Sequence, residues 1–214
     1  MKTDSPFHYS QFFKTVGIFN DLFSSCEYPW EVLPKISDFI SDFKNTNYAA
    51  EYKQISENVF VGRNVTIDDT ARIKGSAIIG HNSTIGHAAF LRGDVLVGEN
   101  VNVGHATEVK HSTILGDTAL AHLNYIGDSI VGSNCNISGG ATLANWRFDR
   151  QNVVIKNGEE RIPTNMEKMG SIIGDKTFIG VSAVINPGTV LACESLVFPL
   201  ISVKGTYLSK TTLK

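Results

Sequence analysis

The chain has 214 residues, of which 42% are hydrophobic and 19% are charged, so a substantial buried core can form. Its 19 lysines and arginines are balanced by 21 aspartates and glutamates, which argues against broad electrostatic binding of nucleic acid. No apolar run is long enough to span a membrane, and the N-terminus lacks the apolar stretch of a secretion signal. The three scattered cysteines, Cys26, Cys135 and Cys193, do not suggest a disulfide framework. We therefore expect a cytoplasmic protein with no nucleic-acid or membrane partner.

Residues 1–57 are predicted to form a helical segment. Apolar residues recur at helical spacing in two stretches, and the second stretch follows Pro34, a residue favoured in a first helical turn. The apolar positions are Phe12, Val16, Phe19, Phe23, Ile36, Phe39, Ile40 and Phe43. We expect two amphipathic helices that cap or flank the start of the domain that follows, where an open strand edge would otherwise invite aggregation.

From about residue 58 an aliphatic residue recurs at every sixth position. The series is Val61, Ile67, Ile73, Ile79, Ile85, Leu91, Val97, Val103, Val109 and Leu115, and Ala121 continues it. A period of six fits neither an α-helix nor the alternation of a simple strand, but it suits a parallel β-helix in which three repeats make one three-faced coil. We predict that these residues point inward, where burying each aliphatic side chain is worth roughly 1.5–3 kcal/mol.

The repeat is interrupted twice. Val131 follows Ala121 two positions too early for the period, and the pattern disappears after Leu143 before returning at Ile173. These breaks predict an irregular coil and then an insertion.

The intervening segment of about residues 147–170 is polar, and Asn157-Gly158 is a turn signal within it. We predict that this segment is a loop extruded from the β-helix, and loops of this length are often functional. The β-helix is expected over residues 58–200, with 201–214 as a C-terminal tail.

Three cations are spaced so that they should stack on successive coils. Lys74, Arg92 and Lys110 recur at every third repeat, and each follows an inward aliphatic residue, so each should point outward. Stacked cations repel one another unless an anion lies nearby, so the set predicts a site for a phosphate group or CoA. The alternative is a solvated face balanced by acids such as Asp94.

His122 lies at the start of the irregular coil, in the segment HLNYIGD. Tyr125, Asn136 and Asn145 follow on succeeding faces. Because an imidazole can accept a proton near neutral pH, His122 is a candidate general base, with a structural histidine as the alternative.

Three further histidines suggest a metal site. His87 and His105 are separated by three repeats, and His111 follows one repeat later. Stacked histidines can bind zinc, although polar residues at coil corners are an equally ordinary explanation.

The stretch EVKHSTILGDTALAHLNYIGDSIVGSNCNISGGATLANW resembles the acetyltransferase half of bifunctional N-acetylglucosamine-1-phosphate uridyltransferase/glucosamine-1-phosphate acetyltransferase. Residues 58–200 also look like the C-terminal β-helix of sugar-1-phosphate nucleotidylyltransferases. The resemblance implies an all-β, single-stranded left-handed parallel β-helix of hexapeptide repeats with a short N-terminal helical segment. It also implies a homotrimer that uses acetyl-CoA to N-acetylate an amino-sugar phosphate such as glucosamine-1-phosphate, without a metal.

Carried over by position, the resemblance makes His122 the catalytic base and places Asn136 beside the reacting amine. Residues assigned by it to the acceptor are Arg92, Lys110, Tyr125, Asn145 and Trp146, the last standing where the family usually has tyrosine. Residues assigned to acetyl-CoA are Gly139, through its backbone, Val181, in place of a family serine, and Lys204.

Three alternatives stay open. The donor could be an acyl carrier protein, as in lipid A acyltransferases of the same fold. The segments LRGD at 91–94 and GHATEVKH at 104–111 resemble γ-class carbonic anhydrase, although the paired histidines are one position further apart than that family expects. The chain could also be a non-catalytic trimeric partner of a separate nucleotidyltransferase, since it has no glycine-rich nucleotide loop of its own.

Overall fold

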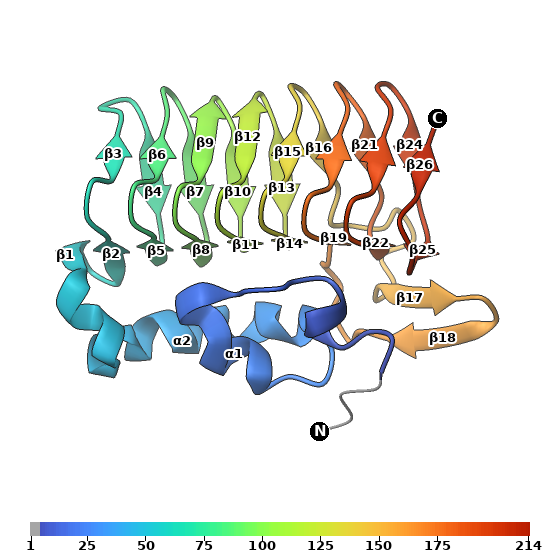
Figure 1. Cartoon of the computed structure of the whole chain (residues 1–214), viewed down its shortest axis with the longest axis horizontal. Helices are drawn as coiled ribbons and strands as arrows, with labels where there is room; N and C mark the ends of the chain where they lie inside the picture. Colours follow the sequence, from blue (N-terminus) through green and yellow to red (C-terminus); the bar gives the residue numbers. More distant parts are fainter. Residues whose placement is uncertain (1–4) are drawn as a thin grey trace.

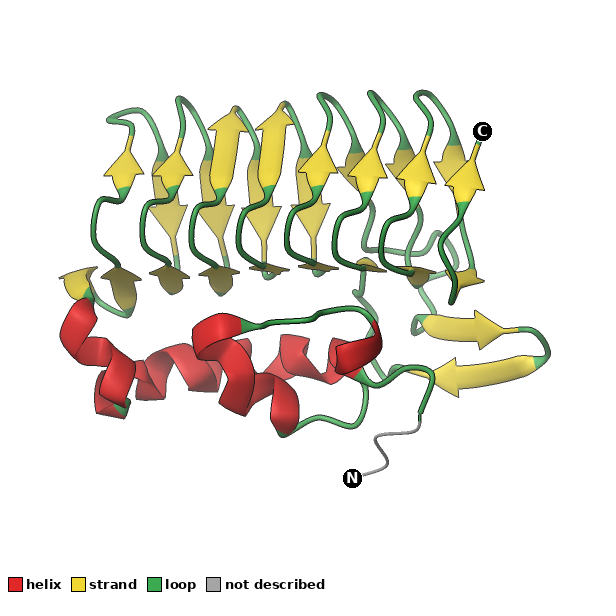
Figure 2. Cartoon of the chain, viewed as in Figure 1, coloured by secondary structure: helices red, strands yellow, loops and turns green. Residues whose placement is uncertain are grey.

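A computed structural model describes residues 5–214 and shows a parallel β-helix with short helices along one side (Figure 1). Short strands follow one another around the coil and form three sheets of nine, eight and seven strands, which we call sheets A, B and C (Figure 2). The predicted left-handed hexapeptide-repeat β-helix is confirmed. No helix within residues 5–214 is both long and apolar enough to cross a membrane.

The strands are short, as the three-faced coil requires. Sheet A contains β1 (Lys53–Ser56), β2 (Val59–Val61), β5 (Ala77–Ile79), β8 (Val95–Val97), β11 (Thr113–Ile114), β14 (Ile130–Val131), β19 (Ser171–Ile173), β22 (Thr189–Leu191) and β25 (Thr206–Tyr207). Sheet B contains β3 (Thr66–Ile67), β6 (Thr84–Ile85), β9 (Asn102–His105), β12 (Ala119–His122), β15 (Asn136–Ile137), β20 (Phe178–Ile179), β23 (Leu196–Val197) and β26 (Thr212–Leu213). Sheet C contains β4 (Arg72–Lys74), β7 (Phe90–Arg92), β10 (Glu108–Lys110), β13 (Tyr125–Gly127), β16 (Thr142–Leu143), β21 (Val184–Ile185) and β24 (Ser202–Val203).

Stacked aliphatic side chains fill the interior of the β-helix. Val97, Val103 and Val109 come from the three successive faces of one coil and are fully buried in one apolar cluster. Val97 pairs with Ile79 on the neighbouring coil, three repeats earlier in the chain. The inward positions predicted from the six-residue repeat are therefore correct through Val109.

Beyond Val109 the inward series changes register earlier than the repeat predicts. Ile114, not Leu115, lies in the core, and its pairing with Val97 makes this coil one residue shorter than three full repeats. Leu120, not Ala121, is the next inward residue. The predictions for Leu115 and Ala121 are wrong because the coil loses one residue at the corner that follows Lys110.

A ladder of serines closes these shorter corners. The Ser112 hydroxyl donates to the Lys110 carbonyl at 2.8 Å, and the Ser129 hydroxyl donates to the Gly127 carbonyl at 2.7 Å. Each hydroxyl also accepts from the next coil: Ser112 from the Ser129 N–H at 2.9 Å, and Ser129 from the Ser171 N–H at 3.0 Å. The hydroxyl takes the place of a turn hydrogen bond, so the corner needs one residue fewer.

The N-terminal segment forms a layer of short helices rather than two long ones. These are the 3-10 helices η1 (Tyr9–Gln11), η2 (Gly17–Phe19), η3 (Pro29–Lys35), η4 (Phe43–Asn45) and η5 (Asn47–Glu51), and the α-helices α1 (Asn20–Ser24) and α2 (Ile36–Asp42). Phe12, Val16, Phe19 and Phe23 are buried as predicted, but only Phe19 and Phe23 lie in helices. Gly17, with φ of 55°, adopts a left-handed conformation that interrupts the first expected helix.

Of the two expected positions, capping or flanking, the layer takes the second: it flanks the β-helix along the outer face of sheet A (Figure 1). Outward side chains of that sheet, including Phe60, Leu96 and Leu115, belong to the same apolar cluster as Phe23 and Trp30. The N-terminal residues therefore supply a second core, which makes sheet A an internal layer of the protein.

Asp175 anchors the start of this layer to the β-helix. Its buried carboxylate accepts from the Lys14 N–H at 2.8 Å and from the Ser133 N–H at 2.7 Å, and its own N–H donates to the Phe12 carbonyl at 2.9 Å. Burial is the main reason that the pKa of Asp175 is raised. One side chain thus joins an early segment to two different coils.

The extruded segment is partly ordered by a hairpin of β17 (Val154–Asn157) and β18 (Glu160–Pro163) that turns at Gly158 (Figure 2). Ile155 and Ile162 on the hairpin are buried in the cluster under sheet A. It is therefore a folded excursion rather than an unstructured loop.

Residues 201–214 continue the β-helix and do not form a separate tail. The strands β24, β25 and β26 add to sheets C, A and B, respectively. Val203 is buried in the core, and Tyr207 and Leu213 pack against it. The step from Val203 to Tyr207 is four positions rather than six, which concealed this last coil in the sequence.

Candidate active site

The predicted stack of cations lies on the outer face of sheet C. Arg92 on β7 pairs in register with Lys74 on β4 and with Lys110 on β10. The next position in this column is Gly127 on β13. Because residue 127 has no side chain, the neighbouring side chains of Tyr125 and Asn145 can lie directly against its backbone.

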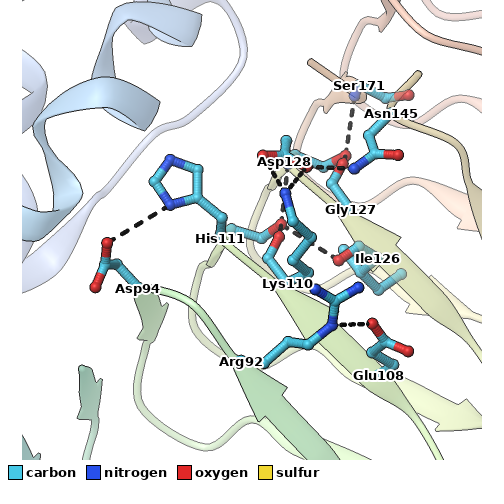
Figure 3. Close-up of polar contacts among 12 residues, drawn as sticks. Arg92, Asp94, Glu108, Lys110, His111, Ile126, Gly127, Asp128, Asn145 and Ser171 are labelled. Atoms are coloured by element: carbon cyan, nitrogen blue, oxygen red, sulfur yellow. Dashed lines mark hydrogen bonds and ion pairs between the residues drawn. The ribbon is translucent and has the colours of Figure 1, made fainter. Parts of the chain in front are cut away.

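Carboxylates lie beside two of these cations (Figure 3). The Arg92 Nε donates to Glu108 at 2.5 Å, and this contact raises the pKa of Arg92. The Lys110 Nζ lies 2.8 Å and 2.6 Å from the two oxygens of Asp128, which is only 4% exposed. The Asn145 amide also donates to Asp128. Glu108 and Asp128 therefore offset the mutual repulsion of the stacked cations.

Tyr125 and Asn145 close over Gly127. A Cβ built on Gly127 would come within 2.7 Å of the Tyr125 hydroxyl oxygen and 2.9 Å of the Asn145 amide carbon. Burial, followed by the charges of Asp128 and Glu108, raises the pKa of Tyr125, which keeps its hydroxyl protonated. Four residues expected to hold the acceptor, Arg92, Lys110, Tyr125 and Asn145, thus lie in one cluster.

His122 lies at the corner between sheets B and C, three residues before Tyr125. A Cβ on Gly139 of the next coil would come within 2.8 Å of the imidazole Nε2. The imidazole is exposed, and it rests against a residue with no side chain. One coil further on, the Ser182 N–H donates to the Gly139 carbonyl at 3.0 Å, so exposed Val181 is the next residue in the same column.

Asn136 lies on sheet B, apart from the cluster on sheet C. It pairs in register with Ala119, three residues before His122, and its amide donates to the Ser138 hydroxyl at 3.3 Å. Its amide is therefore directed along its own strand.

Trp146 and Lys204 share a cavity of about 740 Å³ between the extruded segment and the last coils of sheet C. Its walls are formed by Ala144, Trp146, Arg147, Phe148, Asp149, Val154, Lys156, Val184, Asn186, Pro187, Gly188, Lys204 and Gly205. The Trp146 indole N–H donates to Glu167 at 3.2 Å, and Arg150 and Lys168 lie near the ring. Asn145 of the acceptor cluster directly precedes Trp146 in the chain, so one segment contributes to both the cluster and the cavity.

The histidines proposed for zinc do not converge. The rings of His87 and His105 stack in parallel at 5.2 Å, and His122 pairs with His105 on the following coil. His111 lies at a different corner, with Nδ1 3.8 Å from Asp94. Within residues 5–214, no three His, Cys, Asp or Glu side chains are grouped as a metal would require.

Asp128 and Glu108 were not identified from the sequence as parts of the site. A signal was nevertheless available, because Asp128 follows Lys110 by the length of three repeats and Glu108 follows Arg92 by only slightly less. Counting acids at coil spacing from each cation would have found Asp128, but Glu108 lies two positions short of that spacing.

The similarity to known proteins is concentrated in the central coils of the β-helix. The family described as the GMPPB C-terminal domain matches residues 74–159. The bifunctional protein GlmU of Methanococcus maripaludis is 38% identical over 84 residues, which are 39% of this chain and 20% of that protein. A bifunctional sugar-1-phosphate nucleotidylyltransferase/acetyltransferase of Sulfurisphaera tokodaii is 30% identical over 86 residues, 40% of this chain and 21% of that protein.

A solved structure of a hexapeptide transferase family protein from Anaplasma phagocytophilum is 22% identical, covering 69% of this chain and 74% of that one at a TM-score of 0.33. The chain spans about a fifth of the length of the bifunctional relatives above. The resemblance predicted from the sequence is confirmed over these coils: the chain is a hexapeptide-repeat β-helix protein similar to the C-terminal regions of GlmU-type sugar-1-phosphate nucleotidylyltransferase/acetyltransferases.

Proposed function

We propose that the chain is an acyltransferase that uses acetyl-CoA to N-acetylate an amino-sugar phosphate, with glucosamine-1-phosphate as the reference acceptor. The observation that carries this proposal is the position of His122. Its exposed imidazole lies against Gly139, and His122 precedes Tyr125 of the Lys110–Tyr125–Asn145 cluster by three residues in the chain. Amine acylation of a phosphorylated sugar requires a base and, near it, residues that can hold the phosphate.

In the proposed reaction the acceptor amine attacks the carbonyl carbon of the acetyl thioester. The new C–N bond forms, the C–S bond breaks, and CoA leaves as its thiolate. His122 takes the proton released by the nitrogen and can return it to the sulfur. The Gly139 backbone N–H is the candidate donor to the developing oxyanion, and Asn136 the candidate for orienting the amine.

The acceptor phosphate would be held by Arg92 and Lys110. Arg92 uses its Nε for Glu108, which leaves its terminal nitrogens available to an anion. Lys110 Nζ has three N–H donors, of which Asp128 can occupy two. Tyr125 and Asn145 would contact the sugar.

The donor would lie along the corner from Gly139 past Val181 toward Lys204. The cavity beside Trp146 has mainly apolar walls, and Lys156 and Lys204 are among its lining residues. Apolar walls together with basic side chains suit a pantetheine arm and its phosphates. One relative is by name both a sugar-1-phosphate nucleotidylyltransferase and an acetyltransferase, which is consistent with this donor.

We also propose that the active form is a cytoplasmic homotrimer, with sites completed between subunits. Exposed apolar residues gather on the last coils of sheet B and its corner with sheet C: Phe178, Val181, Leu196, Phe198 and Leu200. Such a patch is typical of an interaction surface. A separate nucleotidyltransferase remains a candidate partner.

The test is release of free CoA from acetyl-CoA in the presence of glucosamine-1-phosphate, with the N-acetyl product identified by mass spectrometry. Turnover that requires both substrates is the expected result. The proposed reaction would be rejected if CoA release did not depend on glucosamine-1-phosphate, or if acetyl-CoA and glucosamine-1-phosphate together gave no release.

A further inference from the structure

The buried carboxylate of Asp128 is the centre of the acceptor cluster. It is 4% exposed and contacts Lys110 Nζ through both oxygens, at 2.8 Å and 2.6 Å. It also accepts from the Asn145 amide (Figure 3). The mechanism proposed above assigns no role to this residue.

The contact with Asp128 determines the orientation of the Asn145 side-chain amide, that is, which side its NH2 group and its carbonyl oxygen face. An ionised carboxylate can only accept hydrogen bonds, so Asn145 must turn its NH2 group toward Asp128. The side-chain carbonyl oxygen of Asn145 then faces away from Asp128, where the neighbouring Tyr125 hydroxyl or a ligand can donate to it. An asparagine is otherwise ambiguous, because its two ends have nearly the same shape and opposite polarity.

The same carboxylate limits what Lys110 can offer. An ammonium group has three N–H donors, and with two directed at Asp128 one is left for a ligand. One carboxylate therefore makes Lys110 a single donor and Asn145 a single acceptor.

Backbone contacts keep this arrangement in place. The Asp128 N–H donates to the Lys110 carbonyl at 2.8 Å, the Gly170 N–H donates to the Asp128 carbonyl at 2.8 Å, and the Met169 N–H donates to the Asn145 backbone carbonyl at 3.0 Å. Asp128 thus sits where the extruded segment leaves and rejoins the β-helix. A substitution of its side chain would leave these backbone bonds intact.

We propose that Asp128 is a positioning residue that sets the hydrogen-bonding polarity of the acceptor site, so that Asn145 accepts from a sugar hydroxyl while Lys110 donates to the phosphate. This inference rests on the proposed function and specifies its substrate class: the acceptor carries a free hydroxyl opposite Asn145. A site built to bind a hydroxyl rejects an analogue without it far more strongly than an apolar pocket does.

The test compares glucosamine-1-phosphate with its 3-deoxy, 4-deoxy and 6-deoxy analogues. For the wild type, kcat/KM is expected to fall for one analogue by about 10- to 100-fold, the effect of losing a hydrogen bond at an oriented site. In Asp128→Asn the neighbouring amide can turn either way, so this preference should shrink to within about threefold. The ratio of kcat/KM values does not depend on the fraction of protein that is folded.

Glu108→Gln is the matched control, because Glu108 is another carboxylate of the cluster but contacts Arg92 instead. It should keep the hydroxyl preference, whatever its effect on rate. An unchanged preference in Asp128→Asn, or the same loss in Glu108→Gln, would overturn the proposal.

A second readout needs no substrate. The side-chain amide signals of Asn145, identified by their absence in Asn145→Ala, should move in the NMR spectrum of Asp128→Asn and stay in place in Glu108→Gln. If the wild type shows no turnover, the proposed reaction fails while this spectrum still tests the polarity of Asn145. Signals that do not move in Asp128→Asn would refute the assigned contact.

Discussion

The imidazole of His122 lies so close to the backbone of Gly139 that a Cβ at residue 139 would come within 2.8 Å of Nε2. The absence of a side chain on one coil therefore determines where the histidine of the preceding coil can rest. Both residues come from the corner between sheets B and C, where His122 is exposed and Gly139 is half-buried. Adding a single methyl group at residue 139 should therefore disturb the imidazole of His122.

Gly139→Ala should lower kcat for acetyl transfer by about 10- to 100-fold, because the added methyl group displaces the imidazole by a fraction of an ångström to an ångström. Thermal stability should change little, since the exposed ring can move into solvent. Gly116→Ala is the control: its nearest contact, the Glu99 carbonyl, is 3.2 Å away and the site is remote. Equal kcat values for wild type and Gly139→Ala would contradict the prediction.

Removing the two acceptor cations should have unequal effects on stability. Lys110→Ala leaves the carboxylate of Asp128 buried without its cation, which should lower the free energy of unfolding by about 3–5 kcal/mol. Arg92→Ala should lower it by about 1 kcal/mol or less, because Arg92 and Glu108 are 38% and 31% exposed. Denaturant unfolding of both variants measures the difference. Similar losses would show that the Lys110–Asp128 pair is not desolvated as described.

Ser129→Ala tests the serine ladder. The substitution leaves the buried Ser171 N–H without its acceptor and removes the bond to the Gly127 carbonyl. We expect a loss of about 1–3 kcal/mol in the free energy of unfolding, the usual effect of an unsatisfied buried donor. Ser209→Ala, at an exposed position, is the matched control. If the two variants are equally stable, the ladder does not support the shortened corners.

The anchor at Asp175 predicts a pH dependence. Because burial raises its pKa in the folded state, this group favours folding most below the unfolded value of about 3.9, and the contribution is lost as pH rises through the folded value. The free energy of unfolding of wild type minus that of Asp175→Asn should therefore decrease as pH rises from about 4. Asp69→Asn, an exposed substitution, controls for general charge effects. A difference that grows with pH would contradict the assignment.

The sequence predicted the β-helix because a six-residue period leaves few other ways to bury one aliphatic residue per face, as Val97, Val103 and Val109 do. It placed the loss of two residues in one break after Ala121, whereas two successive coils are each one residue shorter, a change that depends on hydroxyls such as Ser112 that bond across a corner. Serine is common at turns, so its presence at a corner does not by itself indicate a shorter coil.

The N-terminal layer could be predicted as helical but not placed. Its apolar residues are buried as expected, but the surface that covers them is the outer face of sheet A, including Leu115. A one-residue error in register had assigned Leu115 to the interior of the β-helix. Because of this error, Leu115 was not recognised as part of the surface that the N-terminal layer covers.

For the candidate site, spacing by whole coils placed Arg92 over Lys110 correctly. The partners of these cations were missed, because Asp128 and Glu108 lie on adjacent coils and not beside them in sequence. A count by whole coils would have supplied Asp128, whereas the role of Glu108 and the burial of Asp128 required the structure.

The measurement that tests the proposed function most directly is kcat for acetyl transfer to glucosamine-1-phosphate by wild type, His122→Ala and Leu123→Ala. Leu123 is the exposed neighbour of His122 and serves as the matched control. We predict that His122→Ala lowers kcat by about 100- to 10,000-fold, the range for loss of a general base, with Leu123→Ala close to wild type. A His122→Ala variant that turns over as fast as Leu123→Ala would contradict the role assigned to His122.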